Sequence, residues 1–151
     1  MKLENFDFRI WDKTKEAFLK QEPTLIKLDN ERVIAGRISR FYANTADMFI
    51  GNDNDLEIEL WSGFYDDKGT KIYEGDIVKY RSNTTLLVAV FERNTFYIVD
   101  TSIEKDLQVD CGTRLQGIYE NRSNGYKDNK LGCLEVLGNI HENAELLKIK
   151  E

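Results

Sequence analysis

The alternation of apolar and polar side chains predicts a protein built mainly from β-strands. Residues 6–11 alternate with the period of two that a half-buried strand requires. Residues 56–60 repeat the pattern without a fault, which predicts that Leu56, Ile58 and Leu60 share a buried face. Weaker strand patterns occur at three further places in the amino-terminal part: residues 17–19, 25–28 and 32–38.

Three consecutive strands are predicted in the second half of the chain, at residues 76–80, 86–91 and 96–99. The links between them are short and polar, as hairpins require. The middle one is apolar on both faces and should be a covered, central strand. A closing strand follows at residues 134–140, and Asn143 is expected to cap a short helix over residues 144–148.

Two stretches are less regular. Residues 39–54 are ambiguous, with a short helix possible near residues 45–47. Residues 101–130 are polar and contain glycine, which predicts a long mobile excursion with one irregular strand around residues 115–119.

This order of elements predicts a mainly β protein. A small SH3-like barrel is expected over about residues 61–151, because such barrels remove exposed strand edges by closing on themselves. A β-rich amino-terminal region, residues 1–60, should pack against it, and one short helix should end the chain. The strand patterns place six apolar side chains in the barrel core: Val78, Val88, Val90, Ile98, Val136 and Ile140.

Length and composition agree with a folded protein. The chain has 151 residues, 41% of them hydrophobic and 11% aromatic, enough to close a core. No apolar run approaches the roughly 18 residues that span a bilayer, and the start has no apolar stretch of signal-peptide length. We therefore expect a cytoplasmic protein with no membrane partner.

Charge argues against sequence-independent binding of nucleic acid. The formal net charge is −6, from 21 basic and 27 acidic residues. Nine basic and eight acidic side chains give residues 1–50 a charge of +1, whereas five and ten give residues 51–100 a charge of −5. Seven and nine give residues 101–151 a charge of −2. Phosphate neutralisation needs clustered Lys and Arg, so nucleic acid is disfavoured as a partner, although a local basic face stays open.

The chain offers few residues for catalysis or metal binding. His141 is the only histidine, and Cys111 and Cys133 lie in no CxxC or Cys/His spacing. Asp53, Asp55, Glu57 and Glu59 imitate the first positions of a calcium loop. Ile58 stands where that loop needs glycine, and Phe64 where it needs glutamate, so a solvated strand face is the better interpretation. We expect no cofactor and no metal.

Glu74, Gly75 and Asp76 allow two interpretations. Paired carboxylates can act as general acid and base if burial separates their pKa values. A glycine between two carboxylates, immediately before an apolar strand, also suits a tight turn in which a carboxylate accepts backbone amide hydrogens. We favour an exposed structural turn with a positive φ at Gly75.

Arginines and aromatics provide the candidate nucleic-acid face. Arg32, Arg37 and Arg40 are followed by Phe41 and Tyr42, the composition of a single-strand binding platform. An ordinary solvated strand face explains the same residues.

Three blocks of this sequence resemble the YopX family of phage and prophage proteins. They are FRIWDK at residues 8–13, GFYDDKGTKIYEGDIV at residues 63–78 and LEVLGNIHENAELL at residues 134–147. Trp61-Ser62, His141 and Ala144 depart from the usual family pattern, in positions that concern packing and capping. The resemblance implies a phage or prophage origin and a largely β architecture. It implies no established activity, so it supplies no catalytic residues.

The sequence thus favours a non-enzymatic protein-binding or assembly protein in the host cytoplasm, with an unknown protein partner or a second copy of itself. A nucleic-acid-binding accessory protein is the alternative. A small hydrolase working through Glu74 and Asp76 is a more distant one.

Overall fold

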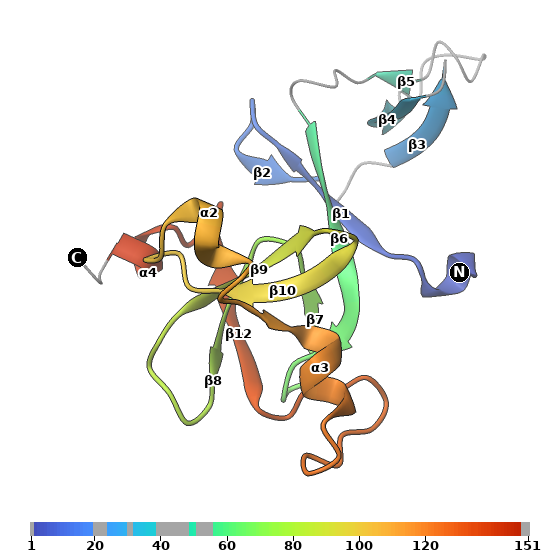
Figure 1. Cartoon of the computed structure of the whole chain (residues 1–151). Helices are drawn as coiled ribbons and strands as arrows, with labels where there is room; N and C mark the ends of the chain where they lie inside the picture. The colour runs from blue at the N-terminus through green and yellow to red at the C-terminus, as the bar shows by residue number, and fades with distance from the viewer. Residues whose placement is uncertain (1, 20–23, 30–31, 39–48, 51–55, 149–151) are drawn as a thin grey trace. The chain divides into compact units, whose positions relative to one another are not determined.

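The computed structural model describes residues 2–19, 24–29, 32–38, 49–50 and 56–148, and their secondary structure is mainly β, as the sequence predicts (Figure 1). The chain divides into two compact units. The smaller unit is Phe8–Glu59, and the larger unit combines Met1–Asp7 with Leu60–Glu151. Strand β6 (Leu56–Tyr65) contributes residues to both.

The smaller unit begins with a hairpin of β1 (Phe8–Asp12) and β2 (Ala17–Phe18). These strands pair antiparallel with Trp11 opposite Phe18, and the two rings meet edge to face with centroids 4.9 Å apart. The turn predicted after β1 is closed by Asp12, whose Oδ1 accepts the amide hydrogens of Thr14 and Lys15 at 2.9 and 3.1 Å. A buried aspartate therefore closes this hairpin.

The smaller unit also contains a three-stranded sheet, in the order β3 (Thr24–Asp29), β4 (Arg32–Ile38), β5 (Phe49–Ile50). β3 and β4 match the two strands predicted from the weaker patterns. The possible helix near residues 45–47 lies outside the described residues.

Glu59 is buried, which corrects the prediction of a solvated face. Its side chain pairs with Arg9, with Nε and Oε1 2.8 Å apart, and Glu59 is only 5% exposed. Glu57 behaves as predicted: it is exposed and lies 3.0 Å from Lys13 Nζ. The prediction assumed that every charged side chain of the strand faces water. Glu59 can be buried instead because its charge is paired with that of Arg9. Asp53 and Asp55 lie outside the described residues.

The main sheet of the larger unit has five strands in the order β11 (Thr113–Arg114), β10 (Thr95–Val99), β9 (Leu87–Glu92), β8 (Asp76–Tyr80), β12 (Leu134–Asn139). β9 is central, as its apolar pattern predicts. Within this unit the second part of β6 pairs with β7 (Lys71–Tyr73), and η1 (Leu3–Asn5) lies near the amino terminus.

The five-stranded sheet curls into a half-barrel. Two strands, β9 and β10, lie between β8 and β11 in the sheet order, yet the side chains of Tyr80 on β8 and Thr113 on β11 interact. Burial raises the pKa of Tyr80 above its ordinary value of 10.0, while a hydrogen bond with Thr113 lowers it by less. The SH3-like closure expected from the sequence stays a prediction.

Apolar side chains from the sheet, β6, β7 and the 115–134 region form one core, centred on nine buried residues: Phe64, Ile72, Val78, Ala89, Ile98, Leu115, Ile118, Leu131 and Leu134. Of the predicted core, Val78, Val88 and Ile98 are buried, and Val90 and Val136 are half-buried. Ile140 is 37% exposed, so its predicted burial is wrong. β12 ends at Asn139, and the alternation used for Ile140 does not continue past that residue.

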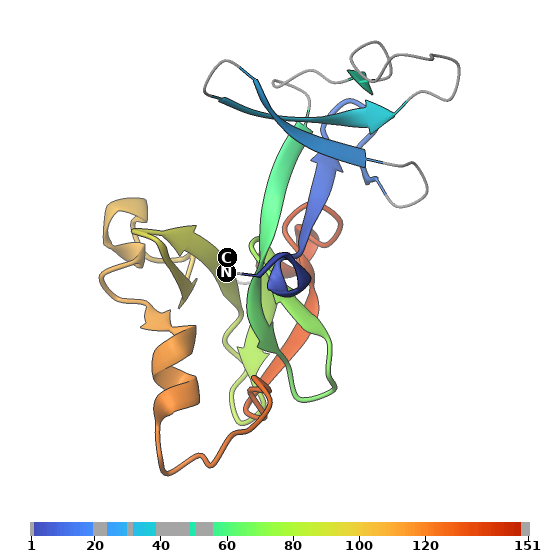
Figure 2. The ribbon, with the colours of Figure 1, turned by 90° about the vertical axis from the view of Figure 1, so that its right-hand side faces the viewer.

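The polar excursion contains helices where a strand was predicted. α2 (Lys105–Gln108) and α3 (Leu115–Glu120) follow one another along the same side of the larger unit, in gold and orange in Figure 2. Leu115 and Ile118 are the buried residues of α3, and their spacing of three places both on one helical face. The strand prediction around residues 115–119 is therefore wrong. A last short helix, α4 (Glu145–Lys148), lies where the carboxy-terminal helix was predicted.

Replacing Ile98 by alanine should destabilise the larger unit. Ile98 is 2% exposed in the core, so Ile98→Ala is expected to lower the free energy of unfolding by about 2–4 kcal/mol through lost burial and a cavity. Ile140→Ala is the matched control, because Ile140 is exposed, and it should change stability by less than about 1 kcal/mol. Urea denaturation measures both; equal shifts in the two variants would contradict this core.

Candidate functional site

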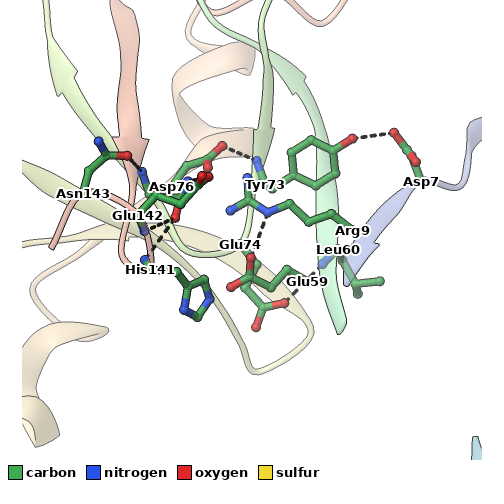
Figure 3. Close-up of polar contacts among 11 residues, drawn as sticks. Asp7, Arg9, Glu59, Leu60, Tyr73, Glu74, Asp76, His141, Glu142 and Asn143 are labelled. Carbon is green, nitrogen blue, oxygen red and sulfur yellow. Dashed lines mark hydrogen bonds and ion pairs between the residues drawn. The ribbon is translucent and has the colours of Figure 1, made fainter. Parts of the chain in front are cut away.

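The turn between β7 and β8 is built around Gly75. Gly75 has a φ of 87°, which confirms the positive φ predicted from the sequence. Asp76 accepts the amide hydrogen of Tyr73 on Oδ2 at 2.8 Å, so the carboxylate closes the turn (Figure 3). Asp76 is 3% exposed and Gly75 is also buried. The expectation of an exposed turn is therefore wrong.

Burial of the turn follows from the backbone hydrogen bonds around it. The amide of Gly75 donates to the carbonyl of Ala89 on β9 at 2.8 Å, and its carbonyl accepts from Ile140 at 2.9 Å. Glu74 exchanges two bonds with Leu60: its amide donates to the Leu60 carbonyl at 2.9 Å, and its Oε2 accepts from the Leu60 amide at 3.3 Å. The turn thus joins β6, β9 and the end of β12.

The two carboxylates of this turn bind backbone amides on different elements. Figure 3 shows Glu74 directed toward Leu60 and Asp76 toward the amide of Tyr73. Each carboxylate therefore has a structural acceptor role. A shared acid–base pair would need both groups at one reacting atom.

A second buried aspartate performs the same task in the turn between β6 and β7. Asp66 Oδ1 accepts the amide hydrogens of Lys68 and Thr70 at 2.9 and 2.8 Å, and Oδ2 accepts that of Val136 on β12 at 3.0 Å. Gly69 completes the turn with a φ of 83°. One carboxylate thereby closes a hairpin and fastens it to the outer edge of β12.

The segment after β12 is held by asparagine side chains. Asn139 Oδ1 accepts the amide hydrogens of His141 and Glu142 at 3.0 and 2.9 Å. Asn143 Oδ1 accepts that of Asn139 at 3.1 Å, and the Asn143 carbonyl accepts the amide hydrogen of Leu146 at 3.0 Å at the start of α4. A Cβ on Gly138 would lie 2.3 Å from Asn143 Oδ1, which explains the glycine there. His141 takes part in this turn through its backbone.

Asp7 organises a polar and aromatic face on β6 and β7 that the sequence did not reveal. Its Oδ2 accepts from the hydroxyl of Tyr73 at 2.6 Å and from Lys71 Nζ at 2.7 Å. Lys71 Nζ also lies 4.6 Å from the centre of the Trp61 ring. Asp7 is more than 60 residues from both partners, so no local pattern could have identified it.

The candidate nucleic-acid face is only partly within the described residues. Arg32 and Arg37 belong to β4, where Arg32 pairs with Asp29 and Arg37 with Thr24 and Ile50 in the backbone register. Arg40, Phe41 and Tyr42 lie outside the described residues.

The remaining reactive side chains form no assembled centre in the described part of the chain. There, no three His, Cys, Asp or Glu side chains group as metal ligands would. Cys111 and Cys133 are free thiols. A hydrogen bond with Cys133 raises the pKa of Tyr126 to about 12, so this hydroxyl stays protonated at neutral pH. No helix of the described residues is long and apolar enough to cross a membrane.

Substitutions in the Gly75 turn should separate a structural role from a catalytic one. Gly75→Val places a β-branched residue at positive φ in a buried turn, and we expect it to cost about 2 kcal/mol or more. Asp76→Asn keeps an oxygen acceptor for the Tyr73 amide and should cost about 1 kcal/mol. Thermal and urea unfolding measure both.

Gly125→Val is the matched control for this comparison. Gly125 also has a positive φ, 63°, but it is exposed and a Cβ there would meet nothing within 4 Å. The excess cost at Gly75 over Gly125 therefore measures the buried turn and its hydrogen bonds. A smaller loss at Gly75 than at Gly125 would contradict this account.

Comparison with known proteins identifies a family. No curated protein matches this chain. A crystal structure of protein EF1440 from Enterococcus faecalis is similar, with 22% sequence identity and a TM-score of 0.49, over 94% of this chain and 97% of that one. The family described as YopX protein matches residues 7–148. The chain, matched over nearly its whole length, belongs to the YopX protein family.

Proposed function

We propose that this protein is a non-enzymatic protein-binding or assembly module. The observation that carries the proposal is the use of the acidic residues in the motif around Gly75. Asp66, Glu74 and Asp76 all accept hydrogen bonds from backbone amides. The motif therefore specifies turns and strand attachment, and its carboxylates already have structural partners.

A hydrolase working through Glu74 and Asp76 receives no support from this geometry. A general acid or base must lie within hydrogen-bond reach of the proton that it transfers. Protonating Asp76 would weaken its bond to the Tyr73 amide, and protonating Glu74 would weaken its bond to Leu60. Proton transfer by Glu74 or Asp76 would thus weaken the hydrogen bonds with which the same side chains stabilise the turn.

The cellular setting is part of the same proposal. The phage or prophage origin that the sequence resemblance implies is carried into this proposal. The protein would then act in the cytoplasm of the host cell and bind a host or phage protein there. Association of two copies of this chain is the second form that such binding would take.

Capture from host cells tests this proposal. Tagged full-length chain, expressed in a bacterial host and treated with nuclease before purification, should recover a defined protein partner in fixed proportion or elute as an oligomer. Gly75→Val is the matched bait, because its destabilised fold should recover less partner. Size-exclusion chromatography with light scattering measures stoichiometry. A folded monomer that recovers only nuclease-sensitive material would contradict the proposal.

Nucleic-acid binding through Arg32, Arg37, Arg40, Phe41 and Tyr42 remains the alternative. It predicts a shift of a labelled single-stranded oligonucleotide at low salt that weakens as salt rises, since counterion release drives such binding. Replacing Arg37 and Arg40 together by alanine should weaken the shift. Absence of any shift at tens of micromolar protein, an amount that detects the weak non-specific range, would remove this alternative.

A further inference from the structure

An open groove of about 430 Å³ lies on the larger unit where the β9–β10 hairpin, β11, α2 and α3 meet. It is lined by polar and apolar side chains and by two glycines: Arg93, Tyr97, Val109, Asp110, Gly112, Thr113, Arg114 and Gly117. β11 is the last strand of the five-stranded sheet, so the groove follows a sheet edge. Both helices beside it are visible in gold and orange in Figure 2.

The groove carries positive charge on an acidic protein. Arg114 is exposed, and no carboxylate of the described residues lies within ion-pair distance of it. Arg93 pairs with Asp110 at 3.0 Å, but their side chains are 62% and 54% exposed. Such exposed pairs contribute little to stability, so the guanidinium of Arg93 can bind another anion at small cost. Two arginines and one aspartate give the lining a net charge of +1.

Arg93 also has an unfavourable backbone conformation. Arg93 and Asn94 form the tight turn of the β9–β10 hairpin, with φ of 53° and 59°. Such turns favour Asn-Gly, because both central residues need positive φ. A long side chain at the first position is uncommon, and strained residues cluster at functional sites. Arg93, which lines the groove, is therefore held in this turn at a cost in backbone energy.

We infer that this groove binds an extended acidic segment of a partner protein, with Arg93 and Arg114 holding its carboxylates. The inference rests on the proposed protein-binding function and names its surface and partner class. Arginine binds carboxylates through two parallel hydrogen bonds, and Tyr97 and Val109 add apolar surface to the lining.

Other occupants fit less well. Small-molecule sites enclose most of their ligand, whereas this groove is open to solvent. A nucleic-acid strand is held by several cations along its phosphates, and here one of three charged groups is a carboxylate. A peptide with a few carboxylates matches both the open shape and the charge of +1.

Fluorescence anisotropy with a labelled peptide of alternating aspartate and leucine tests the inference on the full-length protein. The peptide should bind saturably, and a peptide of alternating lysine and leucine should not. Arg114→Gln and Arg93→Asn should each weaken binding about tenfold. Arg122→Gln is the matched control, since it removes the same charge from an exposed residue outside the groove lining, and it should leave binding unchanged.

Two further measurements separate binding from folding. Arg93→Asn should raise the melting temperature by about 2–4 °C while weakening binding, because asparagine tolerates positive φ better than arginine. Gly117→Glu should keep or improve helix stability and repel the aspartate peptide, whereas Gly117→Lys should bind that peptide at least as well as the unchanged protein does. A Cβ at Gly117 meets only the Cβ of Arg114, at 4.0 Å, so the backbone there has room for a side chain to begin.

Three results would overturn the inference: no binding of the aspartate peptide, equal weakening by Arg122→Gln and Arg114→Gln, or tighter binding of labelled oligothymidine that Arg114→Gln abolishes. A captured cellular partner that still binds the Gly117→Glu protein would also overturn the groove assignment, yet leave the proposed function intact. Peptide binding that behaves as expected, in a protein that captures no cellular partner, would contradict the proposed function and support the groove.

Discussion

The larger unit depends on buried aspartates that accept backbone amide hydrogens in its turns. Asp76 closes the turn around Gly75, and Asp66 closes the turn around Gly69. Both carboxylates are almost fully buried. A buried carboxylate is costly unless hydrogen-bonded, and bonds to backbone amides meet that requirement while removing amides that would otherwise be unpaired. These hydrogen bonds fix the geometry of the two turns, and the geometry of a turn sets the register of the strands that it joins.

This constraint also explains how distant parts of the chain are attached. Asp66 reaches Val136 across 70 residues, and the Gly75 backbone bonds to both Ala89 and Ile140. Asp66 therefore acts both within its own turn and between elements, and Gly75 attaches its turn to β9 and to the residue after β12. Loss of either turn would release β12 as well as the local hairpin, so a local substitution should have a cooperative effect on the whole unit.

Local patterns predicted what depends on neighbours in sequence. β8, β9 and β10 were predicted within one or two residues, because alternating side chains and short polar links specify hairpins. The positive φ at Gly75 was also predicted from neighbours in sequence, because a glycine between two carboxylates, immediately before an apolar strand, suits a tight turn. Two errors arose from short segments: α3 was interpreted as a strand, since an apolar run this short fits both periods. Ile140 was placed in a strand that ends one residue earlier.

What the sequence could not predict depends on partners far away in the chain. Glu59 is buried because Arg9 pairs with it, 50 residues earlier, and Asp7 holds Tyr73 and Lys71 from more than 60 residues away. A polar residue in an alternating strand indicates solvent only if no such partner exists. The groove beside β11 was missed for a related reason: its arginines are 21 positions apart, and α2, β11 and α3 bring them together.

These distant pairings change what net charge says about binding. The formal charge of −6 argued against anionic partners. In residues 51–100, the most acidic part of the sequence, four of the acidic side chains nevertheless have partners close in space. Asp66 and Asp76 are buried against amides, Glu59 pairs with Arg9, and Asp67 Oδ2 lies 3.4 Å from Arg81. At physiological salt the Debye length is about 8 Å, so a bound segment responds to charges beside it far more than to the total. The groove around Arg93 and Arg114 can therefore attract carboxylates on a protein that is acidic as a whole. The affinity for such a segment should fall less steeply with added salt than the affinity of a protein for a polyanion, because only two arginines take part.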